Sequence, residues 1–221
     1  MDSLRECLRQ NRMIRTLVYF LRSIKEKFSY SQGSNNVVDN HGIKVGSKIQ
    51  IIGNDNQVII AHGAVLKKTK LIIIGNNNRI FIKDGAFLDG AVIHVEDNNC
   101  LVQIGDNTYI GPSHIACTED GRHIIIGKDC MLSSNVHIRT GDSHSIIDMN
   151  GKRINEACSV FISDHCWIGE GAKIMKGVRL ETDTVVASGT IVTHTFPSNV
   201  IIAGNPAKVI KESVSWDSRR L

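Results

Sequence analysis

The sequence repeats at a fixed interval, and this periodicity limits the possible folds more than any other feature. Four segments align at a spacing of 22 residues: Val58–Leu66, Ile80–Leu88, Val102–Ile110 and Ile124–Leu132. Asn-rich connections precede or separate the first three copies, and Asn tolerates the left-handed backbone angles of tight corners. Repeats of this kind indicate a solenoid in which each unit stacks on its neighbours.

Farther along the chain the period shortens to six residues. Aliphatic side chains recur at Ile162, Ile168, Ile174, Leu180, Val186 and Val192. The residue four positions after each of the first five is small or β-branched: Cys166, Ala172, Val178, Thr184 and Thr190. Such a rung fits a short strand plus a corner, and three rungs make one triangular coil of about eighteen residues that pairs in parallel with the next. A β-sandwich is the alternative, but its strands alternate at period two. We therefore predict an all-β parallel β-helix over residues 36–212.

Three segments fall outside the rungs. Residues 1–35 contain a predicted basic amphipathic helix at 3–28, with apolar Leu17, Leu21, Ile24 and Phe28 at helical spacing and Arg5, Arg9 and Arg12 along one face. Packing of this helix on the coil or on a neighbouring subunit is favoured over contact with a membrane surface. The rungs also stop from 141 to 159, which predicts an ejected loop, and residues 213–221 form a tail.

Charge and composition exclude several classes of protein. Residues 1–30 hold seven of the 26 Lys and Arg and three of the 22 Asp and Glu, so nineteen of each sign remain in the body of the chain. This balance argues against nucleic-acid binding, which needs a basic face. The sequence lacks a CxxC pair, a signal peptide's apolar stretch and a membrane-spanning run. We expect a cytoplasmic protein, with contact through the N-terminal helix at the inner membrane face as a secondary alternative.

The ejected loop is the predicted functional segment, because a stacked repeat leaves no internal room for a pocket. It carries His144, and Trp167 follows where the rungs resume, which we expect to place the two near one edge of the coil. A neutral imidazole suits a general base that removes a hydroxyl proton. We expect Asp142, Asp148 or a backbone carbonyl to fix its tautomer. His137 is the second candidate base.

Residues 100–212 resemble the hexapeptide-repeat O-acetyltransferases that modify bacterial capsule, O-antigen and related polysaccharides. The resemblance is carried by Ile-Arg-x-x-Asp-x-His-x-Ile at 138–146, Gly-Lys-Arg-Ile-Asn at 151–155, Trp-Ile-Gly at 167–169, Lys-Gly at 176–177 and Ala-Gly-Asn-Pro-Ala-Lys-Val-Ile-Lys at 203–211. It implies a left-handed β-helix and a homotrimer, with transfer of acetyl from acetyl-CoA to a hydroxyl of a surface saccharide. It also implies that His144 is the general base and that Trp167 lines the catalytic site.

The same resemblance suggests which residues contact the two substrates. The predicted coenzyme A groove contains Gly169, Ser188, Thr193, Ala203, Gly204, Lys208 and Lys211. The predicted acceptor-binding residues in the loop are Asp142, Asp148, Arg153 and Asn155. No metal is expected.

Three other functions remain as alternatives. The first is an N-acetyltransferase for a nucleotide-linked amino sugar, although its relatives usually carry an added nucleotide-binding βαβ domain whose glycine motif does not occur in residues 1–40. The second is a γ-type carbonic anhydrase with His114, His137 and His144 as zinc ligands. The third is a non-enzymatic scaffold, which the loop with His144 disfavours.

Overall fold

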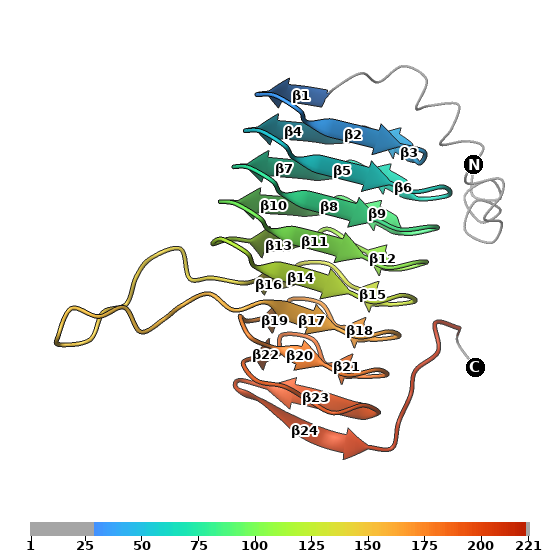
Figure 1. The fold of residues 1–221 in the computed structure, drawn as a ribbon. Helices are drawn as coiled ribbons and strands as arrows, with labels where there is room; N and C mark the ends of the chain where they lie inside the picture. The colour runs from blue at the N-terminus through green and yellow to red at the C-terminus, as the bar shows by residue number, and fades with distance from the viewer. Residues whose placement is uncertain (1–28, 220–221) are drawn as a thin grey trace.

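The computed structural model describes residues 29–219, which wind into a three-sided coil of stacked turns (Figure 1). Within these residues the regular secondary structure consists of β-strands. The predicted helix at 3–28 lies outside the described residues. Each turn of the coil contributes one strand to each of three sheets, here named A, B and C.

From β1 to β22, strands that follow one another along the chain lie on different sheets, and parallel partners within a sheet are three strands apart. Sheet A contains β1 (Ser29–Gln32), β4 (Lys48–Ile52), β7 (Lys70–Ile74), β10 (Val92–Glu96), β13 (His114–Cys117), β16 (His137–Arg139), β19 (Lys173–Ile174) and β22 (Ile191–Val192). Sheet B contains β2 (Val37–Asn40), β5 (Gln57–Ile60), β8 (Arg79–Ile82), β11 (Leu101–Ile104), β14 (His123–Ile126), β17 (Val160–Ile162) and β20 (Arg179–Leu180). Sheet C contains β3 (Ile43–Val45), β6 (Val65–Lys67), β9 (Phe87–Asp89), β12 (Tyr109–Ile110), β15 (Met131–Leu132), β18 (Trp167–Ile168), β21 (Val185–Val186), β23 (Val200–Gly204) and β24 (Ala207–Glu212).

The core is the set of aliphatic columns that the six-residue period predicts. The six members of the column from Ile162 to Val192 are each at most 1% exposed, as are the five small or β-branched residues of the second column. Register explains the column: Ile138 pairs with Ile174 and Ile174 with Val192, so equivalent side chains stack directly above one another. The predicted parallel β-helix is therefore confirmed.

The corners contain Asn and Asp residues of the Asn-rich connections. Asp55, Asn77 and Asn99 occupy the left-handed region with φ of 57°, 54° and 59°. Neighbouring Asn side chains form a ladder along the coil, in which Asn76 Nδ2 donates to Asn98 Oδ1 at 3.0 Å and Asn98 Nδ2 to Asp120 Oδ1 at 3.1 Å. This ladder supplies partners for polar groups that successive turns bring together.

The loop 141–159 leaves the coil between β16 of sheet A and β17 of sheet B and projects to one side (yellow in Figure 1). At the N-terminal end of the coil, β1 pairs with β4, so the coil includes strand residues before the predicted start at position 36. The antiparallel pair β23 and β24 closes the stack, and the chain then turns back along the opposite side from the loop (Figure 1).

Two further observations concern the described residues as a whole. Among them, no helix is long and apolar enough to cross a membrane. Their five cysteines are free thiols, and Cys158 is the exposed one.

Candidate functional site

The loop 141–159 is fastened at its base to the coil. The Thr140 hydroxyl donates to the Thr118 carbonyl at 2.8 Å and accepts from the Thr118 N–H at 2.8 Å. The Thr140 carbonyl accepts from the Cys158 N–H at 2.9 Å, which ties the two ends of the loop together. Thr140 is fully buried. The hydrogen bonds of Thr140 therefore fix both ends of the loop to the coil.

The backbone on both sides of His144 is held by one side chain, that of Asn155. Asn155 Nδ2 donates to the His144 carbonyl at 2.8 Å and to Asp142 Oδ2 at 3.0 Å, while Asn155 Oδ1 accepts from the Ile146 N–H at 2.7 Å. Asn155 is buried, whereas the His144 side chain is exposed. Ser143 adopts a left-handed φ of 67° just before it. The result is an open imidazole on a backbone that hydrogen bonds keep in place.

Two ion pairs join the loop to the coil. Lys176 Nζ, in the corner after β19, donates to Asp142 Oδ2 at 2.5 Å and to the Asn155 carbonyl at 2.8 Å. The hydrogen bond from Lys176 lowers the pKa of the Asp142 carboxyl below its usual value. Arg153 donates through both terminal nitrogens to Glu119, at 2.7 and 2.6 Å, and its hydrogen bond likewise lowers the pKa of Glu119. Such bidentate pairs fix geometry as well as charge.

Asp148 organises the tip of the loop. Its Oδ1 accepts from the backbone N–H groups of Asn150 and Lys152, each at 2.9 Å. Asp142 binds Lys176 and Asn155, so the structure gives both carboxylates partners other than the His144 imidazole. The predicted acceptor-binding set of Asp142, Asp148, Arg153 and Asn155 is thus brought together in the loop, where each side chain supports the loop itself. Contact with an acceptor stays a prediction.

Trp167 does not lie beside the loop, contrary to the expectation that both share one edge. It is the first residue of β18 in sheet C, paired with Met131 and Val185, whereas the loop leaves between sheets A and B. Figure 1 shows β18 and the loop on opposite sides of the coil. The reason is the three-sheet cycle: Trp167 comes two rungs after the rung of Ile138, so it belongs to the third face. Its side chain is partly exposed, at 38% for the residue.

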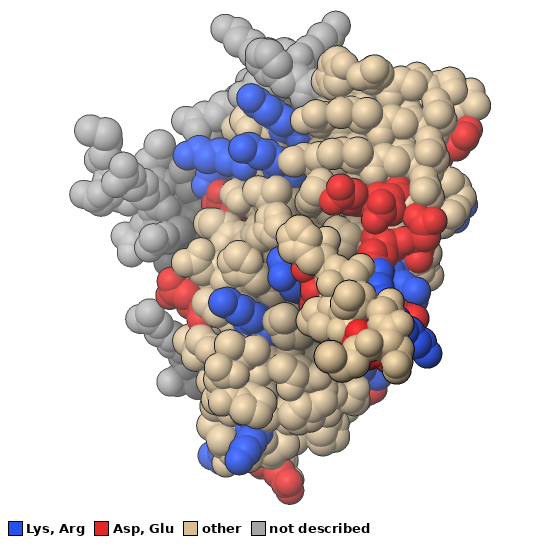
Figure 2. Space-filling view, turned by 90° about the vertical axis from the view of Figure 1, so that its left-hand side faces the viewer, with Lys and Arg blue, Asp and Glu red and all other residues tan. Residues whose placement is uncertain are grey.

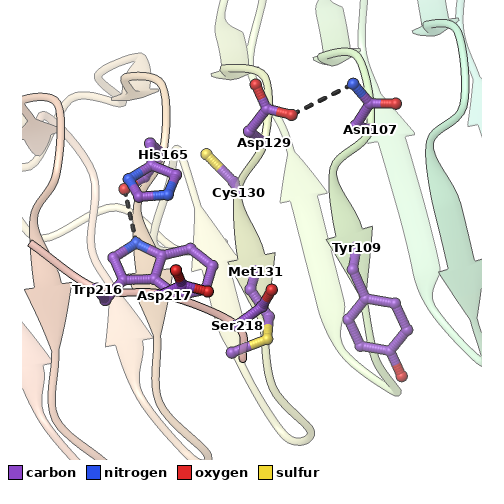
Figure 3. Close-up of a pocket in the computed structure, with 9 residues that line it drawn as sticks. All are labelled: Asn107, Tyr109, Asp129, Cys130, Met131, His165, Trp216, Asp217 and Ser218. Atoms are coloured by element: carbon purple, nitrogen blue, oxygen red, sulfur yellow. Dashed lines mark hydrogen bonds between the residues drawn. The ribbon is translucent and has the colours of Figure 1, made fainter. Parts of the chain in front are cut away.

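Near Trp167, sheet C borders a cavity of about 560 Å³ that the C-terminal segment helps to enclose (Figure 3). Its walls are Asn107, Tyr109, Asp129, Cys130, Met131, His165, Trp216, Asp217 and Ser218. In Figure 3 the Trp216 indole N–H points at the His165 carbonyl, and the hydrogen bond measures 2.8 Å. The residues come from three successive corners and strands of one face and from the returning tail.

The predicted coenzyme groove is divided between two faces. Six of its residues follow the carboxyl ends of β18 and β21 or lie in the β23–β24 hairpin, all at sheet C: Gly169, Ser188, Ala203, Gly204, Lys208 and Lys211. Thr193 follows β22 of sheet A, on the corner that also carries the loop. Gly169 has a packing reason as well, because a Cβ there would lie 2.6 Å from the Ser188 backbone nitrogen.

The histidines considered as zinc ligands are also separated. His114 and His137 are neighbours on sheet A, with ring centroids 6.0 Å apart, and burial lowers the pKa of His114, with the adjacent His137 as the next cause. His144 lies in the loop. Among residues 29–219 no group of three or more His, Cys, Asp or Glu side chains is placed to hold a metal ion.

Four residues of these two regions were not identified as site residues from the sequence: Glu119, Lys176, Asp183 and Trp216. Lys176 had a signal, since it lies in a motif that resembles the acetyltransferases. Glu119 and Trp216 had none, because their partners are 34 and 51 residues away in the chain, without a shared period. Asp183 lies one 18-residue turn after His165, which it contacts, but its second partner, Ser215, is 32 residues away and outside the period.

Comparisons with known proteins agree with this architecture. No protein-family model matches the chain. The crystal structure of the polysialic acid O-acetyltransferase OatWY aligns with a TM-score of 0.84 and 33% identity, over 89% of this chain and 93% of that one. The structure of the polysialic acid specific acetyltransferase NeuO aligns with a TM-score of 0.77 and 32% identity, over 86% of this chain and 88% of that one.

In sequence, the chain is similar to the polysialic acid O-acetyltransferase of Escherichia coli O1:K1, with 40% identity over 98 residues. That match covers 44% of this chain and 32% of the relative, so the chain spans about a third of that protein's length. The identity to OatWY and NeuO, by contrast, extends over nearly the whole of both solved chains. With the stacked six-residue rungs, it shows that this chain belongs to the hexapeptide-repeat O-acetyltransferases of the bacterial polysaccharide type.

Proposed function

We propose that this protein transfers the acetyl group of acetyl-CoA to a hydroxyl of an acidic bacterial polysaccharide, with His144 as the general base. Its coil would have the left-handed sense of the family. The observation that carries the proposal is the position of His144: an exposed imidazole whose flanking backbone is clamped by the buried Asn155. A catalytic base must be both accessible and held in place, and this arrangement provides both.

The chemistry follows from the properties of an imidazole. Neutral His144 accepts the proton of the acceptor hydroxyl while that oxygen forms a bond to the thioester carbonyl carbon. The carbon–sulfur bond then breaks, and the imidazolium returns its proton to the departing coenzyme A sulfur. The products are an acetyl ester and free coenzyme A, and His144 is again neutral. General-base catalysis of this kind contributes roughly 10²–10⁴ to the rate.

The charges on the outer face of sheet A are an argument for an acidic acceptor. Its outward side chains include a series of cationic and imidazole groups that leads to the base of the loop: Lys48, Lys70, His94, His114, His137, Arg139 and Lys173. Register places Lys48 beside Lys70, and His114 beside His137 and then Lys173. Figure 2, which views the side with the loop, shows its largest group of Lys and Arg at the upper left and its largest group of Asp and Glu to the right. A polyanion would be attracted along the cationic part. OatWY and NeuO are named for polysialic acid, an acidic polymer.

Acetyl transfer by purified His144→Ala protein tests the catalytic assignment. Release of coenzyme A with polysialic acid as acceptor should fall by about 10³-fold relative to wild type, with the oligomeric state unchanged by sedimentation. His62→Ala is the matched control, because it removes an exposed imidazole from the corner after β5, outside the loop and the outer face of sheet A, and it should retain most of the turnover. Full activity in His144→Ala would remove the catalytic assignment. Acetylation of an amino-sugar nucleotide in preference to the polymer would favour the N-acetyltransferase alternative.

The acceptor surface has a separate test. The double variant Lys70→Glu, Lys173→Glu should raise the KM for polysialic acid by about tenfold at low ionic strength, and added salt should reduce the difference from wild type. The double variant Lys83→Glu, Lys128→Glu makes the same change in net charge at corners that follow strands of sheet B, and this control should leave KM unchanged. Equal effects of the two double variants would show that net charge, and not the face of sheet A, governs binding.

A further inference from the structure

The C-terminal segment 213–219, here called the strap, is tied to the coil at sheet C. The Val214 N–H donates to the Asn199 carbonyl at 3.1 Å, and Asn199 Nδ2 donates to the Val214 carbonyl at 3.2 Å. The Ser215 hydroxyl donates to Asp183 Oδ1 at 2.6 Å. These contacts fix the strap just before the position of Trp216.

Trp216 packs on His165 in a fixed position, here called its seat. Its indole N–H donates to the His165 carbonyl at 2.8 Å, and the two rings are stacked with centroids 4.7 Å apart and an interplanar angle of 13°. His165 is itself held in a left-handed corner, with φ of 53°, and its Nδ1 lies 2.6 Å from Asp183 Oδ1. Asp183 therefore joins the strap, through Ser215, to the corner that precedes β18.

The seat brings Trp216 against Trp167. The two indole centroids are 5.9 Å apart with an interplanar angle of 43°, a favourable geometry for an aromatic pair. Trp167 stands at the start of a two-residue strand and projects outward, so the rung itself restrains its backbone but little of its side chain. With Trp216 in this position, Trp167 remains 38% exposed.

We infer that Trp216 is a positioning residue for Trp167: the strap seats Trp216 on His165, and Trp216 then fixes the orientation of the Trp167 indole at the acetyl-transfer site. This inference rests on the proposed function, in which Trp167 lines that site. It assigns a role to the strap, whose sequence carries no repeat. It also explains why Asp183 contacts both the strap and the corner.

The test uses the fact that the chain contains two tryptophans. In Trp216→Ala and Trp216→Phe the Trp167 indole is the sole indole fluorophore, so its emission reports its own environment. Trp216→Ala should lower kcat by about tenfold, with the KM for the polysaccharide changed less than twofold. It should also make Trp167 more accessible to acrylamide quenching. Trp216→Phe keeps a ring beside Trp167 and should restore most of kcat and of the protection from quenching.

Arg219→Ala is the matched control, since Arg219 contacts Asp217 at the end of the strap, and it should behave as wild type in every measurement. A strap that only stabilised the fold would lower the melting temperature without a kcat difference between the Ala and Phe variants, and that result would overturn the inference. Wild-type kcat in Trp216→Ala would do so too. If wild-type protein transferred no acetyl group, the proposed function would fail, and equal quenching in the Ala and Phe variants would then refute the positioning contact independently.

Discussion

At the scale of single residues, the loop shows how an exposed side chain can be held by buried ones. His144 is open to solvent, yet its flanking backbone is held by a buried amide, Asn155, which is itself bound by the charged residues Asp142 and Lys176. A buried amide whose oxygen and nitrogen are both hydrogen-bonded resists displacement, because opening the loop would leave those groups without partners. The position of the His144 imidazole therefore depends on residues that need not touch a substrate.

The pH dependence of the loop follows from Asp142. The hydrogen bond from Lys176 lowers its pKa in the folded protein below the unfolded value of about 3.9. The pair therefore stabilises the folded loop at pH values above the unfolded pKa, and this stabilisation is lost as the pH falls through the lowered folded pKa. The protection factors of the amides of residues 141–159, which correct for the intrinsic pH dependence of hydrogen exchange, should fall in wild type below about pH 4. The Glu119–Arg153 pair acts in the same direction.

Asp142→Asn separates the contribution of this carboxyl. At pH 7 the protection factors of its loop amides should already be about tenfold lower than in wild type, and their further decline in acid should be smaller. Lys176→Met, which removes the other partner, should give the same pattern. Identical exchange profiles for wild type and Asp142→Asn from pH 7 to acid would contradict the assignment of this pair as an anchor.

At the scale of elements, the sequence predicts the six-residue rungs well, and the features that it does not predict have physical reasons. Burial every sixth residue determines which side chains point inward, so the columns from Ile162 to Val192 could be read directly. The face on which Trp167 lies also follows from the three-rung cycle, but it requires counting rungs across the ejected loop. The Trp216 seat on His165 could not be predicted, since it joins a segment without periodicity to a corner 51 residues away. The hydrogen bonds of Asn155 depend on the folded path of the loop, which no repeat specifies.

Gly169 tests how closely the rungs must stack. A Cβ at this position would meet backbone atoms of the next turn, 2.6 Å from Ser188 N and 2.8 Å from Val186 O. Because backbone cannot move aside as a flexible side chain can, Gly169→Ala should lower the free energy of unfolding by about 1–3 kcal/mol in thermal or denaturant unfolding. The adjacent exposed Glu170→Ala should change it by less than about 0.5 kcal/mol. Wild-type stability in Gly169→Ala, combined with weaker coenzyme A binding, would instead favour the predicted groove role.

At the scale of the whole molecule, the two residues predicted to share a catalytic site lie on different faces of one chain. His144 extends from the corner between sheets A and B, and Trp167 lies on sheet C across the coil. The loop also exposes apolar side chains, with Ile147 and Ile154 at 62% and Met149 fully exposed. An exposed apolar group of this kind is typical of a surface that another chain covers. Both features are explained if the loop of one subunit reaches sheet C of the next in a cyclic homotrimer.

Mixing of two inactive variants tests this arrangement. If His144 and Trp167 share a catalytic site, the His144→Ala and Trp167→Ala proteins should each be nearly inactive alone. If each site combines His144 of one subunit with Trp167 of its neighbour, random mixing of equal amounts regenerates intact pairs at about a quarter of the sites. Co-expression with two purification tags should therefore recover roughly a quarter of wild-type acetyl transfer per site. Sites contained within one chain would recover none, since every chain in the mixture lacks one of the two residues.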